Sequence, residues 1–387
     1  MKTLVTSFIF TFIWIFVFFL KLQLNPFLLS LFSGLAIFGG AYILATASEI
    51  AEQEISKSFA LAILALIAVL PEYIVDFYFA WMAPKRAVYA SYALANMTGA
   101  NRLLIGIGWP LIFLLFFFKN KESVLFLHKS LSLEIGILLI ATIISFFIIP
   151  FEKLTLFHSA PLLFIFFFYL YKSTKGETEE KEPVGYIKNF FKIEKKKRWF
   201  IVSFFFLYSA FAIIIAGPAF GENLVLSGKL LDISEFLLVQ WVAPFASEAP
   251  EVIILSIYTL KNKEGSAFQA IVSAKINQWS LLVASLPIIF AISSLAFHSL
   301  PIDVRQREEL LLTAAQSFFA VIILSDFEFD YKDAIFLFIL FFAQFIFPSI
   351  HIRLILSVIY LVLAIFLLIF NKRKRKNIKD LLISTFK

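Results

Sequence analysis

The sequence predicts an all-α polytopic membrane protein with about twelve transmembrane helices. Its 387 residues are 61% hydrophobic and only 16% charged, and 51 of them are phenylalanine. Soluble domains are about 45–50% apolar and about 25% charged. This composition and the mean hydropathy of +0.90 together indicate a chain that lies mostly in lipid. The absence of cysteine excludes disulfides, thiolate catalysis and cysteine metal sites.

A helix needs about 20 apolar residues to cross a bilayer. Stretches of this kind predict spans near 4–20, 29–50, 57–81, 86–118, 131–149, 154–171, 199–217, 233–260, 266–296, 308–325, 333–349 and 352–370. The first stretch also fits a secretory signal peptide. KLQLNP follows it instead of a small-residue cleavage site, so a retained helix is predicted.

The main polar stretch, 172–198, predicts a linker between two halves. In its second part lysines alternate with apolar residues, which fits either a helix on an anionic membrane surface or a solvated basic loop. The tail NKRKRKNIKD is also basic. Basic residues favour the cytoplasmic side, so the N-terminus, the linker and the C-terminus of this multi-pass cell-membrane protein are predicted to be cytoplasmic. Anionic lipid is a predicted partner of the linker and tail, and nucleic acid is not a predicted partner.

Two proline-glutamate pairs lie inside predicted spans, Pro71-Glu72 in LAILALIAVLPEYIVDFYFAW and Pro250-Glu251 in FLLVQWVAPFASEAPEVIILSIY. A charge at the bilayer centre costs about 2.5–3.5 kcal/mol on insertion scales. Proline also removes a donor from the helical hydrogen-bond ladder. The repeated combination predicts a functional site built on interrupted helices.

The two halves resemble one another when these pairs are aligned. Ala95-Asn96 then falls on Ala274-Lys275 without a gap. An odd number of crossings separates equivalent helices, so two five-helix repeats of opposite orientation are predicted, with one extra helix at each end. The predicted parts are an extra helix in 1–28, a first repeat in 29–171, a linker in 172–198, a second repeat in 199–349, and an extra helix with a basic tail in 350–387.

Inverted repeats place their binding site near the midplane. Glu72 and Glu251 would then converge on one metal cation, since carboxylates and freed carbonyls suit Ca²⁺ or Na⁺. The alternative for each is pairing with a buried cationic side chain. Glu248 shares a helical face with Glu251, and Asp76 shares one with Glu72. Asp76 is predicted to line an access path or to hold helices together.

The helix after each pair carries further polar groups. Asn96, Asn101 and Gln278 offer amide oxygens. Lys275 is predicted either to face the carboxylates as a tethered monovalent cation or to snorkel to the cytoplasmic surface. Arg102 is predicted to pair with Asp76 or with another acid.

Soluble-type enzyme chemistry has no support in the sequence. The four histidines show no metal spacing, and no glycine-rich phosphate loop, G-x-S-x-G or H-E-x-x-H motif occurs. No catalytic residue and no cofactor is predicted.

The segments SGLAIFGGAYILATASEIAEQ, ALIAVLPEYIVD and ANMTGAN resemble the first signature repeat of the cation/calcium antiporter superfamily, which includes sodium/calcium exchangers. LDISEFLLVQWVAPFASEAPEV and VSAKINQWSLLV resemble the second. The resemblance covers about residues 29–349. It implies two inverted five-helix repeats, and exchange of Ca²⁺ or related cations against Na⁺, K⁺ or H⁺. It also carries the two central glutamates of the family over to Glu72 and Glu251.

Other family ligands are replaced. Ala68-Val69 and Ser247-Glu248 stand where Thr-Ser is usual, and Lys275 stands where asparagine is usual in the second repeat. The pattern is similar to a divergent branch labelled sodium:proton exchangers.

The predicted function is secondary active antiport by alternating access, with Ca²⁺ or Na⁺ exchanged against Na⁺ or H⁺. The predicted cation ligands are Glu72, Glu251, Glu248, Gln278 and Asn96. The predicted charge-substituting or gating residues are Lys275, Asp76, Asn101 and Arg102. The alternative is a non-transporting membrane scaffold derived from the exchanger fold, which the lost hydroxyl ligands favour and the two retained glutamates oppose.

Overall fold

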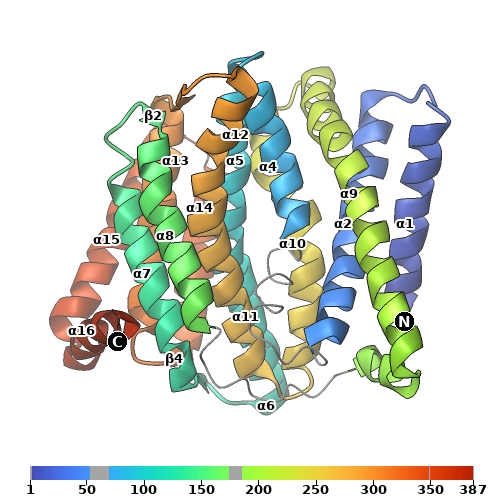
Figure 1. The fold of residues 1–387 in the computed structure, drawn as a ribbon. Coiled ribbons are helices and arrows are strands. Elements are labelled where there is room, and N and C mark those ends of the chain that lie inside the picture. Colours follow the sequence, from blue (N-terminus) through green and yellow to red (C-terminus); the bar gives the residue numbers. More distant parts are fainter. Residues whose placement is uncertain (1, 53–68, 174–184, 348, 387) are drawn as a thin grey trace.

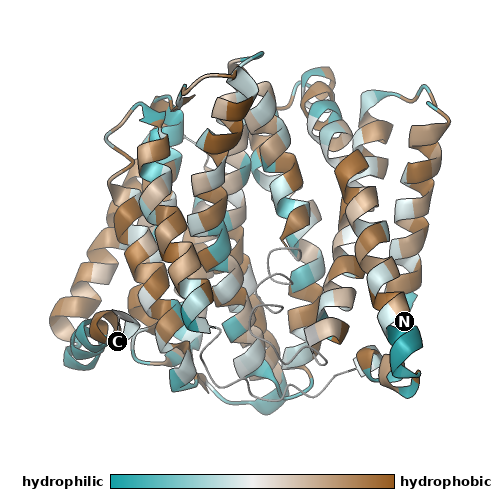
Figure 2. Ribbon diagram, viewed as in Figure 1, coloured by the Kyte–Doolittle hydropathy of each residue, from teal (hydrophilic) through white to brown (hydrophobic). Residues whose placement is uncertain are grey.

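The computed structural model describes residues 2–52, 69–173, 185–347 and 349–386. Its helices stand side by side in one bundle (Figure 1). Hydrophobic residues cover the middle of the bundle, and hydrophilic residues gather toward its two ends (Figure 2). Large apolar side chains face outward, for example Phe157 at 82%, Phe200 at 76% and Leu207 at 74% exposure. Such a surface is stable only in lipid, which is the arrangement expected of a multi-pass membrane protein.

Each predicted span contains a helix wherever its residues are described. The first half forms α1 (Lys2–Phe19), α2 (Pro26–Glu52), α4 (Leu70–Met82), α5 (Val88–Leu103), η1 (Leu104–Gly108), α6 (Trp109–Asn120), η2 (Lys129–Leu131), α7 (Ser132–Phe146) and α8 (Leu156–Ser173). The second half forms η3 (Gly185–Lys192), α9 (Lys195–Leu231), α10 (Glu235–Thr259), α11 (Glu264–Asn277), η4 (Gln278–Leu282), α12 (Val283–Ser294), α13 (Val304–Leu324), α14 (Tyr331–Ile346), α15 (Ile350–Phe370) and α16 (Lys372–Phe386). In the described ranges, nine helical stretches are long and apolar enough to cross a membrane. The first part of the predicted span 57–81, residues 57–68, lies outside the described residues, and α4 covers the rest from Leu70 onward.

The two halves meet along α4, α5, α10 and α11, which all pack together. The helices α4 and α10 run in opposite directions through the bundle (Figure 1). Outside this group, α1, α2 and α9 pack side by side along one flank. Both chain ends and η3 lie at the same end of the molecule (Figure 1).

Two short antiparallel ladders were not anticipated by the all-α prediction. The strand β1 (Val124–Phe126) pairs with β4 (Glu328–Asp330), and β2 (Lys153–Leu154) pairs with β3 (Leu300–Pro301). Each ladder joins a loop of one half to a loop of the other half. Strands of two or three residues leave no periodic pattern in a sequence, because pairing between distant loops creates them.

Three helices differ from their predicted form. The helix α9 is 37 residues long, about 55 Å at ~1.5 Å per residue, and it continues past the predicted end at 217 through Pro218. The tail forms the helix α16, where only a basic tail was predicted. In the linker, η3 buries Ile187 and Phe190 against protein, including α2 and α9, so its apolar face is not free for lipid.

Candidate functional site

Three glutamates converge in the interior of the bundle. Glu72 comes from the first turn of α4, and Glu248 and Glu251 come from α10. A carboxylate oxygen of each lies within 4.8 Å of one from each of the others. Glu248 is fully buried, Glu72 is 5% exposed, and Glu251 is partly buried. The structure thus brings together Glu72, Glu248 and Glu251, three of the five cation ligands that the sequence predicts.

The first proline-glutamate pair begins a helix. Pro71 lies in the first turn of α4, where no helical N–H is lost. The N-terminal end of a helix also carries a partial positive charge, which favours the carboxylate of Glu72. Val69 precedes the helix, and its carbonyl accepts from the Glu72 N–H at 3.2 Å. Ala68 lies outside the described residues.

The second pair does not interrupt its helix, so the prediction of a break at Pro250 was wrong. The helix α10 runs unbroken through Pro244 and Pro250, because its packing against α2, α5, α9 and α11 holds it in shape. Proline still lacks an N–H, so the carbonyl four residues earlier, at Ala246, has no helical donor. Ser247 donates to carbonyls of its own helix, at Ala243 and Pro244.

The amide of Gln278 joins the carboxylates. Its Nε2 donates to Glu72 Oε2 at 3.1 Å and to Glu248 Oε1 at 2.5 Å. Its Oε1 is buried and has no hydrogen-bond partner in the described part of the chain. Gln278 opens the π-helical turn η4. Such turns are frequent at functional sites because they displace a side chain from α-helical register.

Asp76 and Asn96 form a polar layer one helical turn beyond Glu72. Asp76 is fully buried, and Asn96 is its polar neighbour. Neither oxygen of Asp76 has a partner of hydrogen-bond geometry among the described residues, and neither has Asn96 Oδ1. Asn96 was predicted as a ligand of the central cation. In the structure Asn96 neighbours Asp76, whereas the carboxylates grouped within 4.8 Å of one another are those of Glu72, Glu248 and Glu251.

Lys275 neither snorkels nor forms a salt bridge within the described ranges. It is fully buried, so of the two predicted alternatives the one in which it snorkels to the cytoplasmic surface does not hold. Its Nζ donates to Asn101 Oδ1 at 2.7 Å and approaches the Asn101 main-chain oxygen at 3.3 Å. The ammonium also lies 4.6 Å from the ring centre of Trp279. Asn101, predicted as a gating residue, therefore serves as the oxygen partner of a lysine.

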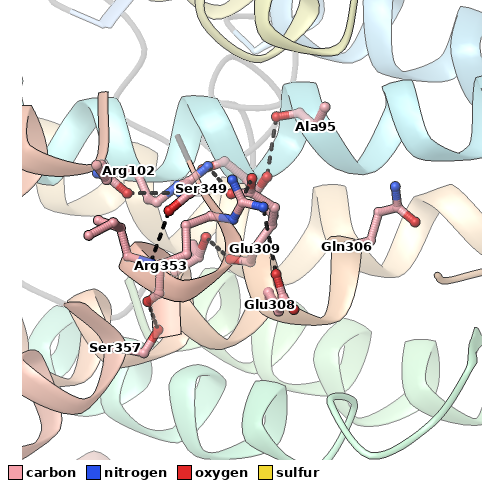
Figure 3. A network of polar contacts seen from close by, with 12 residues as sticks. Ala95, Arg102, Gln306, Glu308, Glu309, Ser349, Arg353 and Ser357 are labelled. Carbon is pink, nitrogen blue, oxygen red and sulfur yellow. Dashed lines mark hydrogen bonds and ion pairs between the residues drawn. The ribbon is translucent and has the colours of Figure 1, made fainter. Parts of the chain in front are cut away.

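Arg102 pairs with an acid other than Asp76. Its guanidinium contacts Glu309 Oε2 at 2.6 Å and donates to Gln344 Oε1 at 2.8 Å. Arg353 lies 3.4 Å from the other oxygen of Glu309. Figure 3 shows this network, in which α5 meets α13 and α15. Glu309 and Arg353 were not singled out from the sequence, although each is a charged residue in or beside a predicted span, and that signal could have found them.

Two further buried contacts also escaped the sequence reading. The hydroxyl of Tyr73 donates to Asn277 Oδ1 at 2.7 Å and so joins α4 to α11. In a separate layer, Gln269 Nε2 donates to Glu134 Oε1 at 2.9 Å. Aromatic and amide partners of this kind are visible only once the helices are packed.

The three glutamates can hold positive charge. Carboxylates this close together repel one another when all are ionised in a buried site, so protons or a cation must balance them. Hard oxygen ligands favour Ca²⁺, Mg²⁺ or Na⁺ over softer metals.

Solved structures of similar proteins decide the family. Over 99% of its length the chain superposes on the H⁺/Ca²⁺ exchanger CAX with a TM-score of 0.94, at 39% identity and covering 96% of that protein. The chain belongs to the cation/calcium antiporter superfamily. The family description "sodium/calcium exchanger protein" matches residues 24–175 of this superfamily member. No curated protein matches it.

More distant solved structures share the fold of this superfamily member. The protein YfkE superposes with a TM-score of 0.62 at 13% identity, with 94% of this chain and 100% of that chain covered. The sodium-calcium exchanger NCX_Mj, soaked with 100 mM Na⁺ and 10 mM Sr²⁺, superposes with a TM-score of 0.56 at 16% identity, with 83% and 97% covered. These likenesses confirm the predicted fold class as an all-α membrane protein, and the twelve helices and the inverted repeats stay predictions.

Proposed function

We propose that this superfamily member is a secondary active antiporter that exchanges Ca²⁺ against H⁺ at Glu72, Glu248 and Glu251. The approach of these carboxylates to within 4.8 Å of one another carries the proposal. The 39% identity to a protein described as an H⁺/Ca²⁺ exchanger supports this choice of ions. It also disfavours the alternative of a non-transporting scaffold.

Competition for the same oxygens couples the two ions. A Ca²⁺ ion draws on ionised carboxylates, whereas protons neutralise them one by one. In a buried site the carboxylates are stable only when one of these partners is present. The site therefore releases Ca²⁺ when protons load it and releases protons when Ca²⁺ loads it.

Gln278 can interact with the site in both its proton-loaded and its Ca²⁺-loaded form. With its amide nitrogen turned to Glu72 and Glu248, it donates to both carboxylates. Rotation of the amide by half a turn would present Oε1, which is an oxygen ligand for a metal. We assign Gln278 to the cation site in this second orientation. Asn96 and Asp76 would line the path by which the cation reaches the site from one side of the membrane.

Alternating access follows from the predicted inverted repeats, residues 29–171 and 199–349. The opposite directions of α4 and α10 fit this arrangement (Figure 1). Inverted repeats let the two sides of the membrane reach one midplane site in turn. The common end of the molecule that holds both chain ends and η3 would face the cytoplasm.

Ca²⁺ uptake into proteoliposomes with an imposed pH gradient tests this function. Glu72→Gln removes one carboxylate and should lower uptake about 10- to 100-fold, since a charged ligand contributes about 1.5–3 kcal/mol. Glu134→Gln is the matched control. Glu134 is also buried and bonded to a glutamine side chain, but it lies outside the cluster, so its variant should transport normally.

The outcomes separate the two functions. Uptake that needs the pH gradient, and that falls in Glu72→Gln but not in Glu134→Gln, supports antiport. Equal flux in wild type, Glu72→Gln and empty vesicles under every ion gradient would leave only the scaffold function.

A further inference from the structure

A lysine occupies a place in which the protein offers oxygen ligands. Asn101 presents both its side-chain and its main-chain oxygen to Lys275 Nζ, at 2.7 and 3.3 Å. The π face of Trp279 closes another side at 4.6 Å. Carbonyl oxygens and aromatic faces bind monovalent cations in general. The ammonium therefore stands where a small monovalent ion would find suitable partners.

The helix that carries Asn101 is shaped for this contact. The π-helical turn η1 begins three residues after Asn101 and widens the helix there. A π turn shifts the hydrogen-bond pattern and frees main-chain carbonyls beside it. The carbonyl of Asn101 faces Lys275, and that of Arg102 faces Gln316 Nε2 at 3.5 Å. Both carbonyls, just before the π turn, receive side-chain donors.

Lys275 also lies next to the carboxylate site. It is one helical turn before Gln278, which bonds to Glu72 and Glu248, and its charge acts on the Glu248 carboxylate. The neighbouring cation Arg102 is already paired with Glu309 at 2.6 Å. Lys275 has no such carboxylate partner among the described residues, so its charge is available to the Glu248 carboxylate.

We propose that Lys275 is a built-in monovalent cation, which takes the place of a second, Na⁺-sized ion and makes the exchange independent of Na⁺. This rests on the proposed function. With Asp76 protonated, three ionised glutamates and one ammonium leave two negative charges. One Ca²⁺ or two protons neutralise that charge. Without the ammonium, three negative charges remain, and Ca²⁺ needs a monovalent partner.

Thermal unfolding of the purified full chain in detergent tests this without transport. Lys275→Asn supplies room and an oxygen, so replacing choline by Na⁺ at constant ionic strength should raise its melting temperature by about 2 °C or more. Lys275→Met fills the space and offers no ligand, so it should show no such rise. Wild type should also be insensitive to Na⁺.

Lys374→Asn is the matched control. Lys374 is also buried, and its Nζ donates to a main-chain carbonyl, Ile323 O at 2.6 Å, and to Asp326 Oδ1 at 2.7 Å. If loss of any buried lysine created a Na⁺ response, this variant would show it too. The proposal expects the response only at position 275.

A second variant covers the case in which Lys275→Asn does not fold. Asn101→Asp keeps the ammonium and cancels its charge, so Na⁺ should again stabilise the protein and stimulate Ca²⁺ uptake. The proposal is overturned if Na⁺ changes the melting temperature of Lys275→Asn no more than that of wild type. If Lys275→Asn cannot be purified, the same outcome in Asn101→Asp overturns it. If wild type exchanges Ca²⁺ for H⁺ but the variants show no Na⁺ response, this inference fails and the proposed function stands. If the variants respond to Na⁺ but wild type shows no exchange, the proposed function fails and the assignment of Lys275 stands.

Discussion

At the scale of single residues, the site depends on how each buried polar atom is satisfied. Gln278 gives two hydrogen bonds to carboxylates, whereas both oxygens of Asp76 lack partners in the described part of the chain. Buried polar groups without partners destabilise the fold, so they are expected to persist mainly where function requires them. The cluster and the layer at Asp76 are therefore poised to receive a proton or a cation.

Gln278→Leu tests the role of the amide. Loss of its donors leaves two buried carboxylates short of a partner, so stability without Ca²⁺ should fall by about 1–3 kcal/mol. The stabilisation gained on adding Ca²⁺ should also shrink, because one oxygen ligand is gone. Gln269→Leu breaks the equivalent bond to Glu134 and should leave the Ca²⁺ response intact. Melting curves with and without Ca²⁺ measure both, and a wild-type Ca²⁺ response in Gln278→Leu would contradict the role.

At the scale of helices, close approach of α5 and α10 sets the geometry of the site. A Cβ on Gly99 would lie 1.9 Å from the Gln240 main-chain oxygen. Small residues at such crossings let membrane helices approach one another. Since α10 carries Glu248 and Glu251, any displacement of it moves two of the three carboxylates.

Gly99→Ala should therefore separate these helices. Overpacking of this kind costs about 1–3 kcal/mol, and Ca²⁺ affinity should fall together with stability. Gly265→Ala is the control, because nothing lies within 4 Å of a Cβ at that position. In a helix that change should be neutral or mildly stabilising. Isothermal titration with Ca²⁺ and thermal unfolding of both variants provide the check, and equal behaviour of the two would refute the packing explanation.

At the scale of the whole molecule, a buried ionic network fastens the added C-terminal helix to the exchanger helices. Arg102 of α5 meets Glu309 of α13, which also contacts Arg353 of α15 (Figure 3). Burying charges is costly, and they persist only when paired. The network includes none of the three glutamates, so we expect it to hold the bundle together. The interaction of anionic lipid with the basic linker and tail stays a prediction.

Arg102→Met should break this network. Glu309 then keeps only the longer contact to Arg353, so the free energy of unfolding should fall by about 3 kcal/mol. Arg307→Met provides the contrast. Arg307 lies 3.9 Å from Glu152, which is 81% exposed, and such a pair contributes at most about 1 kcal/mol. Denaturation in detergent compares them, and similar losses would show that the network adds nothing beyond a surface pair.

The sequence by itself determined the class of this protein, most of its helices and the two central glutamates. Long apolar runs can fold only as membrane helices, and a glutamate in such a run needs a function. Helix packing decided that one proline lies at the start of a helix and the other lies inside one. Pro71 lies in the first turn of α4, whereas α10 stays helical through Pro250, where it packs against neighbouring helices.

Only the tertiary structure decided the partners of the remaining charges. Lys275 contacts Asn101, Arg102 contacts Glu309, and Arg353 contacts the other oxygen of Glu309. Each choice depends on distances of a few ångströms between helices far apart in the chain, and electrostatic energies in a buried medium change steeply over such distances. Spacing along one helix records which residues share its face, but it does not record which other helix that face will meet.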